Sequence, residues 1–223
     1  MDIFALKVIA IVAMLLDHVA AVFFTRKSQQ YMIMREIGRI AFPIFCFCIV
    51  EGFFHTRNVK KYMIRLACFA LISEIPFNLC FYHNVFCLEH QNVFFTLLIG
   101  LVAIYAIEEV KKHFFFFDIK AILLQFIIIG LSMTVAWFLR TDYSMLGVLI
   151  IMAFYFYRGN ILYIAISILV ATLYLGNKVQ LYSLLALIPI LLYNGKKGPS
   201  MRYVFYVFYP AHMLVLYAVS VSL

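Results

Sequence analysis

The sequence predicts an all-α protein, a polytopic transmembrane helix bundle of about nine helices. Hydrophobic residues account for 66% of its 223 residues and charged residues for 13%, whereas soluble domains carry about 25% charged residues. Each crossing of a bilayer takes roughly 20 apolar residues, so this length allows about eight to ten crossings joined by short loops. No length remains for a soluble domain, and we expect residues 1–223 to form a single integral membrane domain.

Nine apolar runs define the expected helices. Charged or turn-rich breaks separate them, in order, at 25–30, 55–61, 83–91, 111–118, 141–142, 158–159, 178 and 195–202. The first run carries charged residues and lacks a small-residue cleavage site, which indicates a retained helix rather than a signal peptide. The sixth to eighth runs are short, and some of them fit tilted or re-entrant segments. The runs cover 3–24, 31–54, 62–82, 92–110, 119–140, 143–157, 160–177, 179–194 and 203–222.

Alternate loops differ in their content of Lys and Arg, which predicts the orientation of the bundle. One set of loops carries eleven basic residues and the opposite set carries four. Because cytosolic loops carry the excess, we expect the amino terminus in the cytosol and the carboxyl terminus outside. The net charge of +8 therefore implies no nucleic-acid partner. The larger set is Arg57, Lys60, Lys61, Arg65, Lys111, Lys112, Lys120, Arg158, Lys196, Lys197 and Arg202, and the smaller is Arg26, Lys27, Arg140 and Lys178.

Ionisable side chains inside a membrane are costly unless they are paired or hydrated, so each is a candidate functional group. Lys7 and His18 are eleven residues apart, which places them on one helix face about 16 Å apart. A long ligand that enters from the cytosol could contact Lys7 and present its reactive end at His18. An imidazole suits general base chemistry near neutral pH. The alternative is that Asp17 and His18 only cap a water-filled helix end.

The second helix and the loop after it carry two polar pairs and a basic stretch. Arg35 and Arg39 share a face, as do Glu51 and His55, because the members of each pair are four residues apart. Arg39 could polarise a carbonyl group, or it could simply pair with a carboxylate such as Asp17. The basic stretch could bind the phosphates of a nucleotide, although positive-inside bias also explains such charges. Its donors are His55, Arg57, Lys60, Lys61 and Arg65.

Polar residues also mark the third helix and the start of the fourth. Glu74, Pro76 and Asn78 indicate a kinked helix, because a proline frees a backbone carbonyl that must find another partner. Asn92 and Thr96 share a face and could contact an acceptor, although Thr in a membrane helix often bonds the backbone instead.

Other motifs of chemistry do not occur. The chain has no Walker loop, nucleophile elbow, HExxH motif or CxxC pair, so we expect no metal site. Cys46 and Cys48 are two residues apart and cannot face one site on a helix. His212, in the last helix, is expected to have a packed structural role.

Six segments along the chain share the pattern of one known family. They are LKVIAIVAMLLDH (6–18), GRIAFPIFCFCIVEGFFHTRN (38–58), RLACFALISEIPFN (65–78), NVFFTLLIGL (92–101), DYSMLGVLIIMAFYFYR (142–158) and VFYPAHM (207–213). These segments resemble the TraX family of membrane acetyltransferases, and GRIAFP and EGFFHTRN make the resemblance specific. The Lys7 to His18 spacing is also distantly similar to a motif of the transmembrane acyltransferases that decorate cell-surface glycans, which resemble the lysosomal heparan acetyltransferase.

The resemblance implies an activity and a set of site residues. The founding member of the family acetylates the amino-terminal residue of conjugative pilin, which implies acetyl-CoA as the donor. It implies His18 as the catalytic residue, with Asp17 beside it and Arg39 in the active site. We expect acetyl-CoA contacts at Lys7, Glu51, His55, Arg57, Lys60, Lys61 and Arg65, and acceptor contacts at Glu74, Asn78, Asn92 and Thr96.

The expected function is transfer of an acetyl group from cytosolic acetyl-CoA to an amine or hydroxyl at the membrane. The acceptor would be a peptide amino terminus, a cell-surface glycan or a small molecule. His18 would deprotonate it, directly or through an acetyl-histidine intermediate, while Arg39 or Asn92 stabilises the oxyanion. A bacterial inner membrane fits the family, and the oligomeric state stays open. The rival function is a small proton-coupled transporter or channel, in which the intramembrane Asp, Glu and His residues form a proton relay.

Overall fold

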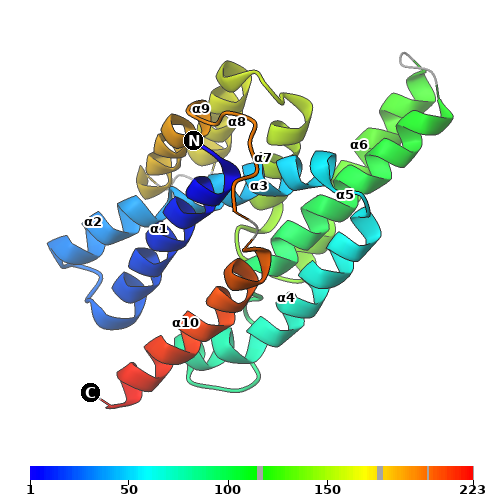
Figure 1. Cartoon of the computed structure of the whole chain (residues 1–223). Helices are drawn as coiled ribbons and strands as arrows, with labels where there is room; N and C mark the ends of the chain where they lie inside the picture. Colours follow the sequence, from blue (N-terminus) through cyan, green and yellow to red (C-terminus); the bar gives the residue numbers. More distant parts are fainter. Residues whose placement is uncertain (115–117, 175–177, 200, 223) are drawn as a thin grey trace.

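The computed structural model describes residues 1–114, 118–174, 178–199 and 201–222 (Figure 1). Within these ranges the chain forms helices and turns and no β-strand, which confirms the predicted fold class. The helices are α1 (Ile3–Phe23), α2 (Gln29–Gly38), α3 (Ala41–His55), α4 (Val59–Tyr82), α5 (Val93–His113), α6 (Ile119–Phe138), α7 (Ser144–Phe156), α8 (Ile161–Tyr174), the 3₁₀ helix η1 (Lys178–Ala186), α9 (Leu187–Leu191) and α10 (Arg202–Ser222).

In the described ranges, six helical segments are long and apolar enough to cross a membrane, namely α1, α2 with α3, α4, α5, α6 and α10. Three shorter apolar segments, α7, α8 and η1 with α9, match the three short runs of the sequence. The predicted helix at 160–177 ends at residues outside the described ranges. Phe126 and Phe138 of α6 are 68% and 77% exposed, as expected of side chains that face lipid.

The helix predicted over 31–54 is interrupted at Arg39 and Ile40, where α2 ends and α3 begins. Pro43 in the first turn of α3 has no N–H, so it cannot bond the carbonyl of Arg39 four residues earlier. The backbone tightens instead, and the Arg39 N–H donates to the carbonyls of Arg35 and Glu36, both at 3.2 Å. The interruption places Arg39 between two helices.

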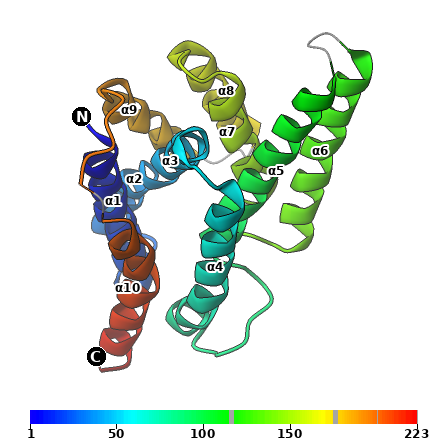
Figure 2. The ribbon, with the colours of Figure 1, turned by 45° about the vertical axis from the view of Figure 1, so that its right-hand side comes forward.

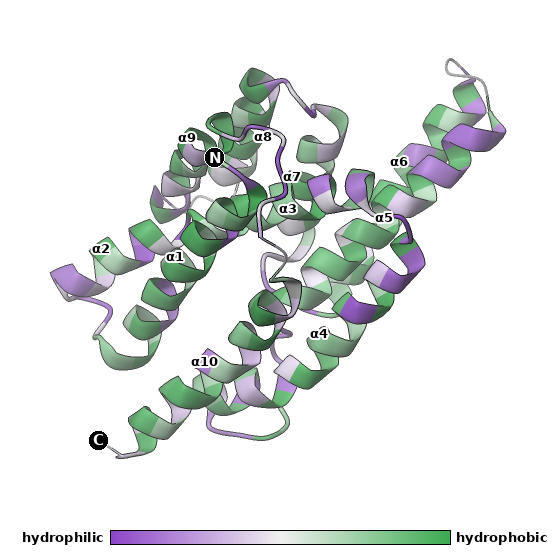
Figure 3. Ribbon diagram, in the orientation of Figure 1, coloured by the Kyte–Doolittle hydropathy of each residue, from purple (hydrophilic) through white to green (hydrophobic). Residues whose placement is uncertain are grey.

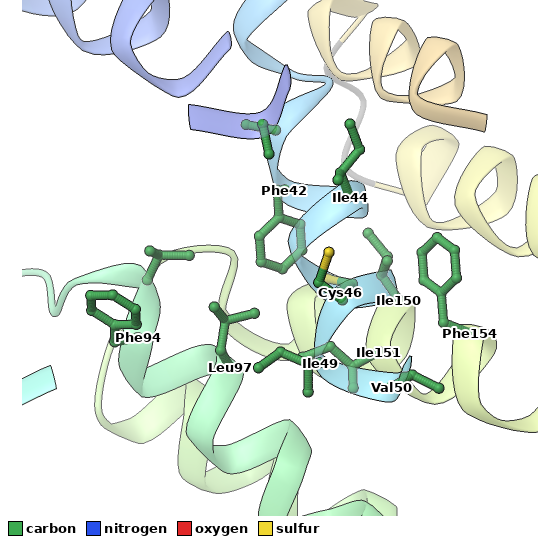
Figure 4. Close-up of a cluster of buried hydrophobic side chains, with 14 of the residues drawn as sticks. Phe42, Ile44, Cys46, Ile49, Val50, Phe94, Leu97, Ile150, Ile151 and Phe154 are labelled. Atoms are coloured by element: carbon green, nitrogen blue, oxygen red, sulfur yellow. The ribbon is translucent and has the colours of Figure 1, made fainter. Parts of the chain in front are cut away.

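Helix α3 lies in the interior of the bundle, packed against α1, α5 and α7. Figure 4 shows Phe42, Cys46 and Ile49 of α3 beside Leu97 of α5 and Ile151 of α7. Each of these side chains is at most 5% exposed. This helix carries Glu51 into the protein interior, whereas His55 at its carboxyl end is exposed.

The two chain termini lie at opposite ends of the bundle (Figure 1). Figure 3 shows hydrophilic residues gathered at the ends of α4, α5 and α6 that point away from the carboxyl terminus. Figure 2 shows α1, α2 and α10 on one side of the molecule and α5 and α6 on the other. Helix α10 packs against both α1 and α4. Which end faces the cytosol stays a prediction.

Candidate active site

Two cavities lie at different levels of the bundle, and α1 lines both. The first includes Lys7 and has a volume of about 350 Å³; we call it the Lys7 cavity. The second includes Asp17 and His18 and has a volume of about 530 Å³; we call it the His18 cavity. The helical rise separates Lys7 from His18 by about 16 Å. The predicted entrance and the predicted reactive position thus open into two separate cavities on one helix.

Side chains from α1 to α4, from α10 and from the segment between α6 and α7 form the walls of the His18 cavity. Aromatic rings, including those of Phe45, Phe81 and Tyr209, supply much of its surface. Charged and titratable groups occupy the remainder, which makes the cavity amphipathic. These groups are Asp17, His18, Arg26, Arg35, Arg39, His90 and Asp142, together with the phenols Tyr31, Tyr82 and Tyr143.

Asp17 binds two arginines. Its Oδ2 accepts a hydrogen bond from Arg35 Nη1 at 2.6 Å, and its Oδ1 accepts one from Arg39 Nη2 at 2.5 Å. Both carboxylate oxygens are therefore engaged by guanidinium groups, and among the described residues neither oxygen bonds His18. The carboxylate joins α1 to the break between α2 and α3, which was the alternative role weighed for Arg39 from the sequence.

Arg39 also reaches across the cavity to residues far away in the chain. Its Nη1 lies 3.3 Å from the Tyr143 hydroxyl and 3.4 Å from Gln180 Oε1 of η1. The side chain of Arg39 is 13% exposed. Arg39 is thus a nearly buried, oriented cation on the wall of the His18 cavity, where it can stabilise negative charge.

Gly38 allows the close approach on which the Asp17 pairs depend. A Cβ atom at this position would collide with the Asp17 side chain. We expect Gly38→Ala to destabilise the protein by about 1–3 kcal/mol, the usual cost of overpacking. Gly130→Ala is the control, because nothing lies within 4 Å of a Cβ there. Thermal unfolding in detergent measures both variants, and equal stability of the two would contradict this reading of α1–α2 packing.

His18 forms a pair with His212 of α10. His18 Nδ1 lies 2.8 Å from His212 Nε2, and the two ring planes are inclined by only 6°. His212 Nδ1 in turn lies 2.8 Å from the carbonyl oxygen of Phe208. The rings of Phe81 and Tyr209 contact His18 edge-on, with centroids 5.5 and 6.2 Å away. The packed role expected for His212 therefore includes a direct hydrogen bond to the candidate base, which no local spacing could indicate.

Asp142 and Tyr143 complete the wall opposite α1. The Asp142 N–H donates to the Gln91 carbonyl at 2.9 Å, and the Asp142 carbonyl accepts a hydrogen bond from the Thr96 hydroxyl. Tyr143 stacks on Phe42 with ring centroids 3.7 Å apart. Burial raises the pKa of the Asp142 carboxyl, and Arg39 opposes that rise. Burial likewise raises the pKa of Tyr143. Their sequence separation from α1 kept both out of the predicted site.

The Lys7 cavity brings together four of the residues predicted to contact acetyl-CoA, namely Lys7, Glu51, His55 and Arg65. The aromatic rings of Tyr62, Tyr193, Phe205 and Tyr206 and the cation of Lys197 line it as well. The other three predicted contacts, Arg57, Lys60 and Lys61, are exposed and are not among the described residues that line this cavity.

Two details of the Lys7 cavity bear on ligand binding. The Glu51 carboxylate forms an ion pair with Arg158, because its Oε1 accepts a hydrogen bond from Arg158 Nε at 2.6 Å. Together with burial, Glu51 raises the pKa of Tyr193 to about 12. Arg65, by contrast, has a buried Nε atom without a hydrogen-bond partner in the described part of the chain. The cavity therefore offers a cationic donor that lacks an acceptor.

None of the four predicted acceptor contacts is among the described residues that line the His18 cavity. The Asn92 side-chain amide donates to Glu74 Oε2 at 2.6 Å and to the Ala70 carbonyl at 2.8 Å. Asn78 Nδ2 lies 3.4 Å from the Val85 carbonyl oxygen, and the Thr96 hydroxyl donates a hydrogen bond to the Asp142 carbonyl. These contacts hold α4, α5 and the segment before α7 together. A role in acceptor binding stays a prediction.

No group of three or more His, Cys, Asp or Glu side chains that could hold a metal occurs in the described residues.

The chain is similar to one protein family and to proteins of two bacteria. The family model described as TraX protein matches residues 3–220. A protein of Dichelobacter nodosus described as "Probable fimbrial assembly protein FimC, serogroup H1" is 33% identical over 238 aligned positions, which cover 96% of this chain and 93% of that protein. An uncharacterised protein of Rickettsia prowazekii is 28% identical over 111 positions, or 50% of this chain and 40% of that protein. No solved structure matches the chain.

Proposed function

Because this chain belongs to the TraX family, we propose that it is an acetyltransferase that moves an acetyl group from cytosolic acetyl-CoA to an amine or hydroxyl acceptor. It is an integral membrane protein, and the family and its bacterial relatives place it in a bacterial inner membrane. One observation carries the proposal: α1 lines a cationic, aromatic cavity at Lys7 and a second cavity at His18, whose wall also holds two arginines that Asp17 orients.

The Lys7 cavity has the chemistry that a nucleotide end of acetyl-CoA requires. Lys7, Arg65 and Lys197 supply positive charge for phosphates. The unpartnered Nε of Arg65 is a donor that a phosphate oxygen would satisfy. Tyr62 and Tyr193 offer ring faces for a purine base. In this proposal the basic end of the bundle, with the Lys7 cavity, faces the cytosol.

The acetylated arm of the donor would extend along α1 and bring its thioester to the His18 cavity. His18 takes a proton from the acceptor as the acceptor's nitrogen or oxygen attacks the thioester carbonyl. The tetrahedral oxyanion then collapses, the carbon–sulfur bond breaks, and the thiolate receives the proton from His18. Arg39 is better placed than Asn92 to stabilise the oxyanion, because Arg39 lines the His18 cavity, whereas Asn92 is fully buried and is not among the described residues that line it.

Two chemical classes of acceptor fit this proposal. The D. nodosus relative is described as a probable fimbrial assembly protein, which favours the amino terminus of a pilin-like protein. A cell-surface glycan or a small molecule remains the second class. The His18 cavity suits either, since its aromatic wall and its charged groups can bind an apolar and a polar part of one molecule.

Arg65→Ala is expected to weaken acetyl-CoA binding by about 10- to 100-fold, since a hydrogen bond to a charged group contributes about 1.5–3 kcal/mol. Thermal stability should change little, because the Nε atom has no described hydrogen-bond partner and the guanidinium loses only its cation–π contact with Tyr62. Titration of the purified protein with acetyl-CoA, in detergent at low salt, measures the affinity.

Lys60→Ala is the matched control for this experiment, because Lys60 is exposed on the same stretch but does not appear on the described wall of the cavity. Its affinity should equal that of the wild type. Loss of binding in Lys60→Ala with full binding in Arg65→Ala would move the phosphates to the exposed loop formed by Arg57, Lys60 and Lys61.

A further inference from the structure

A chain of hydrogen bonds runs from α10 to the candidate base. The carbonyl oxygen of Phe208 lies 2.8 Å from His212 Nδ1, and His212 Nε2 lies 2.8 Å from His18 Nδ1. His212 is 6% exposed and packs its ring against Phe208 and Tyr209, at centroid distances of 4.9 and 5.5 Å. The imidazole of His212 is therefore held on both sides, by its own helix and by α1.

This chain has a fixed direction when both imidazoles are neutral. A carbonyl oxygen only accepts, so the Nδ1 of His212 must carry the proton. A neutral imidazole has one N–H, which leaves the Nε2 of His212 as an acceptor. The Nδ1 of His18 must then donate to it. His18 consequently carries its proton on Nδ1 and a lone pair on Nε2.

The lone pair of His18 is available to the cavity. His18 lines the His18 cavity, whereas His212 is not among the described residues that do. The neighbouring rings of Phe81 and Tyr209 meet His18 edge-on, and neither side chain donates a described hydrogen bond to its Nε2. No residue in the described part of the chain forms a hydrogen bond with Nε2 of His18. A base with a free lone pair is what abstraction of a proton from an acceptor needs.

We propose that His212 is a positioning residue, which holds His18 in the Nδ1–H tautomer so that Nε2 faces the acceptor as a base. This inference rests on the proposed acetyl transfer. Without the acceptor at His212, the more common Nε2–H tautomer of His18 would point an N–H group at the reaction centre. In the reaction, Nε2 gains the acceptor's proton and later passes it to the thiolate, while the Nδ1–H bond to His212 persists.

Two substitutions separate the hydrogen bond from the packing. His212→Phe keeps a ring of similar size and removes the acceptor. His212→Gln can return an acceptor oxygen near the position of Nε2. We expect His212→Phe to lower kcat about 10- to 100-fold, by analogy with the loss of hydrogen-bond partners that orient metal-ligating histidines. The KM for acetyl-CoA should stay unchanged, and His212→Gln should recover most of the loss.

Nitrogen-15 NMR of histidine-labelled protein tests the tautomer without any activity. The His18 signals are assigned by comparison with His18→Ala. We expect Nδ1 of His18 to be protonated and Nε2 unprotonated in the wild type, and the Nε2–H form to dominate in His212→Phe. A wild-type His18 protonated on Nε2 would overturn the proposal.

The kinetic result can also overturn it. Wild-type kcat in a stable His212→Phe protein means that the bond does not position the base. Equal losses in His212→Phe and His212→Gln, in step with lower melting temperatures, mean that the residue only packs. Failure of the proposed function looks different, because the wild type itself would then release no CoA while the NMR result stands.

Discussion

His18→Ala is expected to lower acetyl transfer by about 10²- to 10⁴-fold, the usual cost of removing a general base. Binding of acetyl-CoA should persist, because the cationic donors line the Lys7 cavity, about 16 Å away along α1. The measurement is CoA release from acetyl-CoA in the presence of an acceptor, together with acetyl-CoA titration and thermal unfolding of the same preparation.

His113→Ala is the control for His18, since it removes an exposed imidazole at the end of α5 and should leave all three readouts unchanged. A stable His18→Ala protein with wild-type turnover would end the proposed mechanism. The search for the base would then return to Glu51, His55 and Glu74.

Asp17→Asn is expected to cause the largest loss of stability, about 3–5 kcal/mol, because removing one partner leaves buried charges uncompensated. The carboxylate is 10% exposed, and it binds Arg35 and Arg39, which are 27% and 13% exposed. Asp17 and its neighbour His18 face different partners, since Asp17 binds the two arginines and His18 binds His212. Thermal or denaturant unfolding in detergent measures the effect.

Glu109→Gln provides the comparison. Glu109 pairs with Lys112 at 2.7 Å, a similar distance, but on the exposed end of α5. Exposed ion pairs contribute little to stability, so this variant should unfold like the wild type. If Asp17→Asn is as stable as Glu109→Gln, the two arginines do not depend on the carboxylate.

Composition and hydropathy predicted the helices well, because the bilayer demands long apolar segments with satisfied backbones. The three short runs could be separated from full crossings by length alone. The interruption at Arg39 was not predicted. Pro43 was the residue that indicated this interruption, since a proline in the first turn of α3 leaves the carbonyl of Arg39 without its helical hydrogen bond.

The arrangement of the candidate site could be predicted along one helix but not between helices. Periodicity along α1 placed Lys7 and His18 on one face, and the structure opens a cavity at each. His18 pairs with His212, which lies 194 positions away in the sequence. Asp142 and Tyr143, which line the same cavity as His18, also lie far from α1 in the sequence. No spacing rule reaches across such distances. Charge alone did not separate Arg65, which lines the Lys7 cavity, from its exposed neighbours Lys60 and Lys61.

Acetyl transfer to a peptide acceptor can be followed with the purified protein. Purified protein in lipid nanodiscs is mixed with acetyl-CoA and a pilin-like peptide that has a free amino terminus, and both CoA release and peptide mass are followed. If the protein is an acetyltransferase, CoA is released, the peptide gains one acetyl group, and His18→Ala abolishes both. A protein that neither binds acetyl-CoA nor releases CoA, and that instead carries protons into proteoliposomes, would contradict it.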